Sequence, residues 1–226
     1  MPDIFLNFDL CEQQTDAFHT EVMSQLHMAN ISCVKLQTIE KCAQLAEAQK
    51  PIAVSTGAFI CPIGNEPVEQ LTLTQFRALL EIQLIRYTSA ADLNHIKLHS
   101  SLLQLVENDD EFSVAFLEFV RNRCLISIVC PLGSNLEKLA NEVALPVTPE
   151  IMLDAHYSAE GKIIEDTIDS SLVITRLEQL HQFGSLTTDH GDTITLPEQY
   201  DHITVSLSSP LDFDQLKKVR SYLDAI

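Results

Sequence analysis

The chain has 226 residues, a formal net charge of −18 and 46% hydrophobic residues. This apolar content suits a single globular domain over residues 1–226 rather than a disordered segment. The negative charge repels nucleic-acid phosphates and anionic lipids, so neither nucleic acid nor a membrane surface is an expected partner.

Apolar segments typical of β-strands alternate along the chain with amphipathic segments typical of α-helices. We predict strands at residues 4–9, 30–36, 52–55, 95–99, 125–130 and 203–207. We predict helices at residues 15–28, 38–49, 74–93, 111–121, 135–143, 169–183 and 212–223, several of which begin with a Thr, Asn or Asp that can cap free amides. The alternation predicts an α/β fold.

The first predicted strand ends in polar groups. In the sequence Ile-Phe-Leu-Asn-Phe-Asp-Leu-Cys-Glu, which starts at residue 4, Asn7 and Asp9 share one face of the strand, and Glu12 follows it. In parallel α/β sheets and barrels, ligands are held at the carboxyl ends of the strands. We therefore expect these acids at the rim of a ligand site.

A His-Ile-Lys-Leu-His sequence begins at residue 95 and alternates perfectly. On a strand, this pattern projects His95, Lys97 and His99 from one face. If this face lies across a barrel rim from the acids of the first strand, carboxylates, a cation and proton-transfer groups share one cleft. The alternative is a solvent-facing edge strand.

Other common chemistries lack their sequence patterns. His95 and His99 would be about 13 Å apart on a strand, too far to share one ion, so we predict no metal site. The chain contains neither a GxSxG elbow nor a Gly-rich phosphate loop.

The cysteines and the amino-terminal segment bear on localisation. The six cysteines show neither CxxC pairs nor a regular spacing, which disfavours both a metal knuckle and a disulfide framework. Residues 1–30 contain no basic segment followed by a long apolar run, and no segment reaches the roughly 18 apolar residues that span a bilayer. We therefore expect a cytoplasmic protein with reduced thiols.

A second apolar segment, at residues 151–153, is followed by Asp154 and Tyr157. It repeats the pattern of the first strand, so these side chains are a candidate contribution to the same rim. From spacing alone, a capped turn ahead of residues 159–162 is the alternative. The Asp-His-Gly-Asp sequence at residues 189–192 has the composition of a hairpin turn, and we interpret it as a loop.

Taken in order, these motifs resemble the LamB/YcsF family, whose characterised bacterial members are the A subunit of the ATP-dependent 5-oxoprolinase. Residues 7–12 (Asn-Phe-Asp-Leu-Cys-Glu) resemble the family's N-x-D-L-G-E, and residues 29–33 (Ala-Asn-Ile-Ser-Cys) resemble the start of its A-N-I-A-C-G-F-H-A-G-D. Residues 95–99 resemble its H-V-K-P-H-G. Comparable family residues also fall at Leu132-Gly133-Ser134, Asp154, Tyr157 and Glu160-Gly161.

The resemblance, which spans nearly the whole chain, implies a distorted, incomplete (β/α) TIM-like barrel of the glycoside hydrolase/deacetylase type. It implies a hydrolase that opens the cyclic amide of 5-oxoproline to glutamate with ATP, together with partner B and C subunits, the ATP being bound within that complex. By position, it implies catalytic roles for Asp9, Glu12, Lys97 and His99, and substrate binding by Asn7, Asn30, His95, Asp154 and Tyr157.

The chain also departs from the family pattern. Residues 34–39 (Val-Lys-Leu-Gln-Thr-Ile) replace G-F-H-A-G-D, residues 55–58 (Ser-Thr-Gly-Ala) replace G-A-H-P, Ala155 replaces an Arg, and residues 206–209 (Ser-Leu-Ser-Ser) replace a late H-G-D. Lys35 restores one positive charge, but an ammonium cannot reproduce the proton transfer of an imidazole. Two alternatives therefore accompany the hydrolase: a catalytically silent binding or scaffold protein on the same barrel, and a related hydrolase with another substrate.

Overall fold

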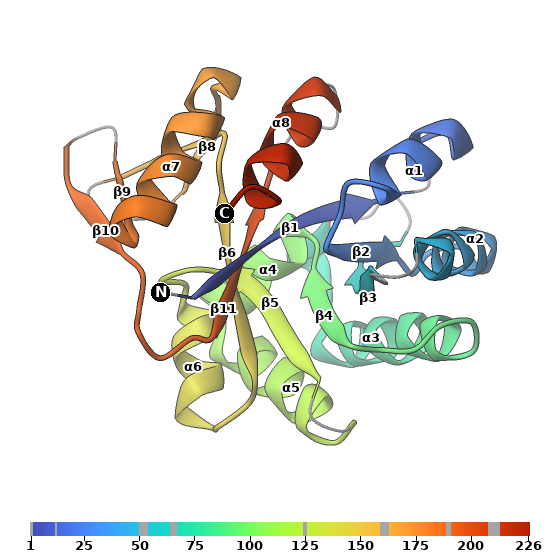
Figure 1. The fold of residues 1–226 in the computed structure, drawn as a ribbon. Helices are drawn as coiled ribbons and strands as arrows, with labels where there is room; N and C mark the ends of the chain where they lie inside the picture. The colour runs from blue at the N-terminus through green and yellow to red at the C-terminus, as the bar shows by residue number, and fades with distance from the viewer. Residues whose placement is uncertain are drawn as a thin grey trace.

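The computed structural model describes residues 2–11, 13–49, 54–63, 67–123, 126–158, 163–188, 191–207 and 213–226. Within these residues, seven parallel strands form a closed barrel in the order β1-β11-β6-β5-β4-β3-β2 (Figure 1). Their bounds are Asp3–Leu10 for β1, Met28–Ser32 for β2, Ser55–Ile60 for β3, His95–Leu98 for β4, Ser127–Pro131 for β5, Val147–Met152 for β6 and His202–Ser206 for β11. The predicted TIM-like barrel is confirmed, and it closes with one strand fewer than a TIM barrel.

Helices surround the barrel (Figure 1). They are α1 (Asp16–Met23), α2 (Leu36–Ala48), α3 (Leu73–Thr88), α4 (Ser100–Asn108), α5 (Asp110–Arg121), α6 (Asn135–Glu142), α7 (Val173–Phe183) and α8 (Phe213–Leu223), with short 3₁₀ helices η1 (Val68–Gln70) and η2 (Ser170–Leu172). None of the helices in the described ranges is long and apolar enough to cross a bilayer.

The connection from β6 to β11 contains two antiparallel strand pairs outside the barrel. They are β7 (Ala155–Tyr157) with β8 (Ile163–Ile168), and β9 (Ser185–Thr187) with β10 (Thr193–Thr195). The hairpin turn predicted at residues 189–192 falls between β9 and β10 in the sequence, and residues 189 and 190 lie outside the described part of the chain. In Figure 1, this second pair lies beside α7 at one side of the barrel.

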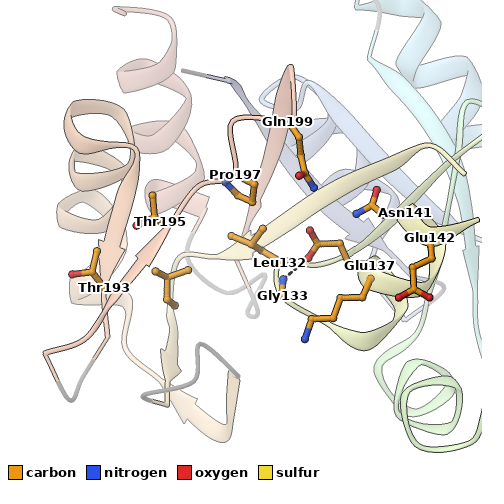
Figure 2. A pocket seen from close by; sticks show the side chains of 11 residues that line it. Leu132, Gly133, Glu137, Asn141, Glu142, Thr193, Thr195, Pro197 and Gln199 are labelled. Carbon is orange, nitrogen blue, oxygen red and sulfur yellow. Dashed lines mark hydrogen bonds between the residues drawn. The ribbon is translucent and has the colours of Figure 1, made fainter. Parts of the chain in front are cut away.

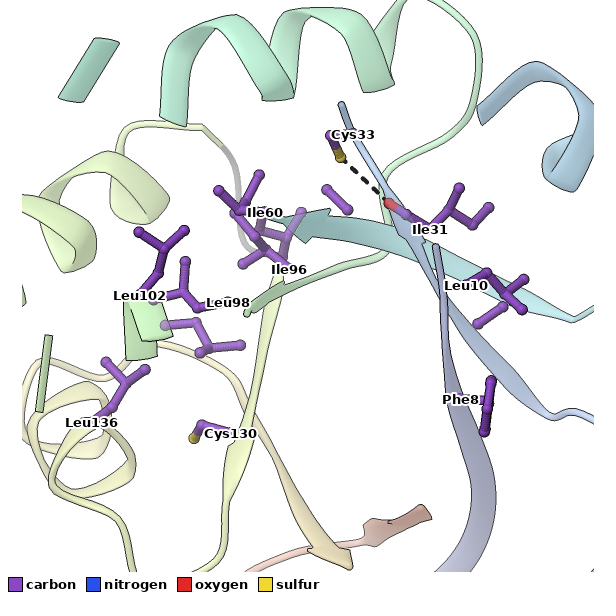
Figure 3. Close-up of a cluster of buried hydrophobic side chains, with 14 of the residues drawn as sticks. Phe8, Leu10, Ile31, Cys33, Ile60, Ile96, Leu98, Leu102, Cys130 and Leu136 are labelled. Carbon is purple, nitrogen blue, oxygen red and sulfur yellow. Dashed lines mark hydrogen bonds between the residues drawn. The ribbon is translucent and has the colours of Figure 1, made fainter. Parts of the chain in front are cut away.

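Strand alternation divides the barrel into an apolar outer layer and a polar interior. On β1, Leu6, Phe8 and Leu10 are at most 3% exposed and belong to the hydrophobic core under the helices. Figure 3 shows Phe8 and Leu10 in this outer layer, together with Ile31 of β2 and Ile96 of β4. The intervening residues face the barrel interior, where most of the polar side chains discussed below lie.

Helix α3 shows how local sequence sets an element. Thr72 and Gln75 form a capping box at its start, in which each side chain receives a hydrogen bond from the other residue's backbone N–H. Phe76, Leu80 and Leu84 are buried at four-residue steps against the barrel. The helix ends at Thr88, five residues before the predicted end at residue 93.

Other boundaries and elements differ from prediction for identifiable reasons. Helix α1 ends at Met23, because Met28, the predicted end of this helix, opens strand β2 instead. Helix α4 was not predicted, since it begins directly after the predicted strand at residues 95–99. Strand β6 was not predicted either, because Pro149 lies at its centre and an internal Pro argues against a strand.

Gly57 on β3 makes room inside the barrel for the ring of His95 on the neighbouring strand β4. A Cβ atom added at Gly57 would lie 2.2 Å from His95 Cδ2 and 2.4 Å from Nε2. A methyl group and the imidazole ring therefore cannot occupy this space together. Glycine is needed at position 57 because the His95 ring packs closely against its backbone.

We expect Gly57→Ala to lower the free energy of unfolding by about 1–3 kcal/mol or more, because the methyl group overpacks the barrel interior. Urea denaturation of the purified chain measures the change. In a His95→Ala background the same substitution should cost much less, since the clashing ring is gone. An equal cost in both backgrounds would show that Gly57 is not packed as described.

Candidate functional site

Five polar side chains inside the barrel form a closed circuit of hydrogen bonds and ion pairs, which we call the barrel ring: Asn7, Asp9, Asn30, Lys97 and Glu150. Lys97 Nζ lies 2.9 Å from Asp9 Oδ1 and 2.8 Å from Glu150 Oε1. Asn7 Nδ2 donates to Glu150 Oε1 at 3.0 Å. Asn30 Nδ2 donates to Asn7 Oδ1 at 2.9 Å and to Asp9 Oδ1 at 2.6 Å.

The barrel ring is assembled from β1, β2, β4 and β6 by strand register. Asp9 lies directly opposite Asn30 on the neighbouring strand, so both side chains point to the same face. Asp9 and Lys97 are each the second-to-last residue of their strand. They therefore lie at the carboxyl end of the barrel, where the active sites of TIM barrels are found. The Asp9 side chain is 33% exposed, whereas those of Lys97 and Glu150 are 11% and 5% exposed. Asp9 therefore lies on the solvent side of the ring.

Lys97 is held as a cation by two carboxylates. Burial lowers the pKa of Lys97, but the charges and hydrogen bonds of Asp9 and Glu150 more than offset burial, and the pKa is raised above its ordinary value. The ammonium is therefore suited to contacting a negative oxygen and unsuited to acting as a base at neutral pH. With two carboxylates and one ammonium, the ring carries a formal charge of −1.

His95 fixes the orientation of Asn30. His95 Nε2 lies 2.9 Å from Asn30 Oδ1. Because the Asn30 amide nitrogen donates to two other oxygens, Oδ1 must accept, and His95 Nε2 carries the hydrogen. Burial, followed by the charge of Lys97, lowers the pKa of His95 to about 4, so the imidazole is neutral at pH 7.

Two expectations about residues 95–99 are wrong. Strand β4 ends at Leu98, so His99 is the N-cap of α4 and does not continue the strand face. The edge-strand alternative is also wrong, because β4 lies between β3 and β5 and His95 is 1% exposed. The alternation was read correctly for His95 and Lys97, both of which point into the barrel.

His99 nevertheless lies near the barrel ring. Its ring centroid is 5.9 Å from that of Phe59, and Lys97 Nζ is 5.9 Å from the same Phe59 ring. His99 Nδ1 accepts the Ser101 backbone N–H at 3.3 Å, so the neutral imidazole carries its hydrogen on Nε2. Burial lowers the pKa of His99, with Asp9 opposing this effect, which favours the neutral form at pH 7.

Asp154 and Tyr157 lie on the chain that leaves β6. The Tyr157 hydroxyl accepts the Met152 N–H at 2.9 Å and donates to the Met152 carbonyl at 3.0 Å. The Arg176 guanidinium lies 5.4 Å from the Tyr157 ring and donates to the Leu153 carbonyl at 3.1 Å. Burial raises the pKa of the Tyr157 hydroxyl, and the buried Asp154 carboxylate acts in the same direction. These contacts hold the segment in place after β6.

The predicted site residues therefore have different outcomes in the structure. It brings Asn7, Asp9, Asn30, His95 and Lys97 into direct contact inside the barrel. Glu12 lies outside the described residues. The catalytic and binding roles assigned to these side chains remain predictions.

Sequence reasoning missed Glu150, which completes the barrel ring. In the sequence Val-Thr-Pro-Glu-Ile-Met, Thr148 and Glu150 share one strand face, but Pro149 concealed the strand. Val129 of β5 pairs with Lys97 on β4 and with Thr148 on β6, so Thr148 is in register with Lys97. The Lys97 side chain faces the barrel interior. Glu150, two residues after Thr148, faces the same way. The polar side chains of Thr148 and Glu150, one on each side of Pro149, were the sequence signal that could have revealed this strand and its polar face.

The described residues contain no metal-binding cluster, and the donors at the start of α6 and at Lys97 are already bound to carboxylates. Among them, no group of three or more His, Cys, Asp or Glu side chains is arranged to hold a metal. The first amides of α6 follow the Leu-Gly-Ser turn, but Asn135 and Leu136 donate to the Glu107 carboxylate at 2.7 and 2.8 Å. Lys97 already contacts three carboxylate oxygens. These donors do not fit an ATP phosphate chain.

Comparisons with known proteins find relatives of this chain by sequence. The model of the LamB/YcsF family matches residues 4–225. The chain is 25% identical over 235 residues to a 5-oxoprolinase A subunit of Chloroflexus aggregans, covering 93% of this chain and 90% of the relative. It is 27% identical over 222 residues to a 5-oxoprolinase A subunit of Limosilactobacillus fermentum, covering 87% and 86%.

Solved structures show the same fold. A lactam utilization protein from Thermus thermophilus superposes with a TM-score of 0.83 at 18% identity, covering 99% of this chain and 96% of the other. An uncharacterized protein from Agrobacterium tumefaciens superposes with a TM-score of 0.62 at 9% identity, covering 98% and 82%. At these identities the likeness concerns the fold.

We expect Lys97→Met to lower the free energy of unfolding by about 3–5 kcal/mol, because Asp9 and Glu150 then lose their shared cation in a buried place. Urea denaturation measures the loss. Lys217, whose Nζ lies 3.7 Å from Glu21 on the surface, provides the control, and Lys217→Met should change stability by less than about 1 kcal/mol. Equal effects of the two substitutions would contradict the burial and pairing of Lys97.

We expect His95 to make the fold less stable as the pH falls from about 6.5 to about 4. The unfolded chain binds a proton on His95 near pH 6.5, whereas the folded chain does so only near pH 4. Protonation therefore favours the unfolded state across this window by up to about 3 kcal/mol, at about 1.36 kcal/mol per pKa unit. Above pH 6.5 the contribution of His95 to stability is complete and constant.

Urea denaturation at a series of pH values, compared between the native chain and His95→Gln, isolates this effect from the titration of the carboxylates. The stability difference between the two chains should shrink as the pH falls through the window. A difference that stays constant from pH 7 to pH 4 would show that His95 titrates normally in the fold.

Proposed function

The chain belongs to the LamB/YcsF family, and we propose that it is the A subunit of an ATP-dependent 5-oxoprolinase that opens the lactam of 5-oxoproline. The observation that carries the proposal is Lys97, a buried ammonium held between Asp9 and Glu150 at the carboxyl end of the barrel. Relatives matching nearly the full length of the chain are named as the A subunit of 5-oxoprolinase, which supports the same substrate. A cytoplasmic location is part of this proposal.

In the overall reaction, the bond between the carbonyl carbon and the ring nitrogen of the lactam breaks. Water supplies the oxygen of the new carboxylate and a proton for the released amine. ATP is hydrolysed to ADP and phosphate. An amide carbonyl is a poor electrophile, so the site must stabilise negative charge that develops on the carbonyl oxygen.

Each side chain near the ring has a role that its chemistry allows. Lys97 places positive charge beside the developing oxyanion. Asp9 is the most exposed carboxylate of the ring, and its Oδ2 contacts only Lys97 among the described ring residues, so it is suited to orienting water or accepting a proton. The Nε2–H of His99 can donate a hydrogen bond to the substrate. Glu150, Asn7 and Asn30 hold Lys97 and Asp9 in position.

The charge of the barrel ring bears on how the substrate binds. The ring carries a formal charge of −1, and 5-oxoproline carries a carboxylate at neutral pH. The two repel each other, so the neutral amide should face Lys97 while the substrate carboxylate lies away from the ring. Lys35, an exposed residue at the start of α2, is the cation that follows β2.

Binding of ATP belongs, in this proposal, to the partner B and C subunits. The Asn135 and Leu136 amides and the Lys97 ammonium, which could otherwise meet phosphate, are already bound to carboxylates. We therefore derive no step of the reaction through ATP on this chain. The proposed contribution of the chain is to bind the lactam and to move protons or water at the carbonyl.

One observation favours the alternative of a silent binding protein on the same barrel. The segment after β2 forms the start of α2, where Lys35 and Leu36 are exposed and neither a His nor an acid is present. The rim at this strand therefore lacks a proton-transfer group. The two functions differ in whether bound lactam is turned over.

The test is glutamate release from 5-oxoproline and ATP by this chain mixed with its partner B and C subunits. We expect turnover that Asp9→Asn and Lys97→Met each reduce by about 100- to 10,000-fold, because each removes a charge beside the reacting carbonyl. Circular dichroism shows whether the variants remain folded, and Lys217→Met should keep native activity.

The result also separates the alternatives. Complex formation without glutamate release would favour the silent binding protein. ATP hydrolysis that does not respond to 5-oxoproline would overturn the proposed substrate. Glutamate release that persists in both ring variants would overturn the assignment of the barrel ring as the reactive site.

A further inference from the structure

Strand β10 has an open edge. Among the described residues it pairs only with β9. The Leu196 N–H donates to the Gly184 carbonyl at 2.7 Å, so the backbone N–H and C=O groups of Leu196 point toward β9. The backbone groups of Ile194, two residues earlier, also point toward β9. In an antiparallel pair this alternation turns the backbone N–H and C=O groups of Thr193 and Thr195 away from β9. Both threonines are exposed.

A pocket of about 540 Å³ lies along this open edge, with helix α6 as its opposite wall (Figure 2). All three residues of β10 line the pocket, and none of β9 does. Lys138, Asn141 and Glu142 line it from α6. The outward backbone groups of β10 therefore meet a space bounded by a helix, which is the setting in which an added strand binds a sheet edge.

The net charge of the chain favours one kind of partner, whereas the exposed Lys138 and Glu142 of the lining offset each other. The Glu137 carboxylate is already engaged, since it accepts the Tyr200 hydroxyl at 2.6 Å and the Gly133 N–H. Glu142 is exposed and forms no ion pair with a described residue. The whole chain carries −18, so a second copy or an acidic segment is repelled. A basic segment is attracted.

We propose that the open edge of β10 and the facing side of α6 bind an extended, basic segment of another protein. The segment adds to β10 as a third strand, bonds to the outward backbone groups of Thr193 and Thr195, and places a Lys or Arg side chain against Glu142. No residue of the barrel ring takes part, so the inference is independent of the proposed enzymatic function.

The probe is an acetylated and amidated peptide of about seven residues that alternates valine and lysine, since strand side chains alternate between two faces. The full chain, labelled with ¹⁵N, is titrated with it and followed by NMR. We expect saturable binding with a Kd below about 1 mM and the largest amide shifts at Thr193 and Thr195. A peptide of the same sequence with alternate amides N-methylated keeps the charge but lacks strand hydrogen bonds, and should bind about tenfold more weakly.

Protein variants provide matched controls. Thr195→Pro removes an outward N–H while leaving the bonds of Ile194 and Leu196 to β9, and should weaken binding by about tenfold. Glu142→Gln should weaken it by about threefold, and Lys138→Gln should not weaken it. Equal binding of the N-methylated peptide, shifts confined to other surfaces, or no saturable binding up to about 1 mM would each overturn the proposal.

Discussion

The ammonium of Lys97, held between the Asp9 and Glu150 carboxylates inside a closed barrel, is the interaction on which the candidate site depends. Removing charges from water is expensive, and a buried ion pair often stabilises a fold no better than apolar side chains of the same size. Here the carboxylates and amides of the barrel ring also hydrogen-bond to one another, which limits the desolvation penalty. The polar side chains inside the barrel are thus better explained by the charged groups that they hold at the carboxyl end of the barrel than by a contribution to the stability of the fold.

The order of the barrel ring keeps its charges at fixed positions. His95 holds the Asn30 amide, Asn30 donates to Asp9, and Asp9 meets Lys97. Gly57 gives His95 the room to stand inside the barrel. A site whose dipoles are already oriented needs little reorganisation when charge develops on a substrate. This preorganisation is the physical basis for the proposal that the carboxyl end of the barrel acts on a lactam.

The surface of the chain suggests a protein that works with others. Its charge of −18 disfavours self-association and attracts basic partners. The Asn135 and Leu136 amides and the Lys97 ammonium are bound to carboxylates, and for this reason the proposed function assigns ATP to another subunit. The residues that line the pocket beside β10 include none of the barrel ring, so a partner at β10 and a lactam at the ring would contact different side chains.

The sequence by itself determined the α/β alternation and the strand face that Asn7 shares with Asp9 and His95 with Lys97, because strand periodicity is a local property of the chain. The TIM-like barrel came from the resemblance of its ordered motifs to a known family. The sequence did not reveal β6 or Glu150, since Pro149 breaks the local pattern of a strand that its neighbours in the barrel stabilise. Only the tertiary structure decided that Lys97 is shared by two carboxylates and that His99 caps a helix. Those facts depend on register between strands far apart in sequence, and on where β4 ends, neither of which local periodicity encodes.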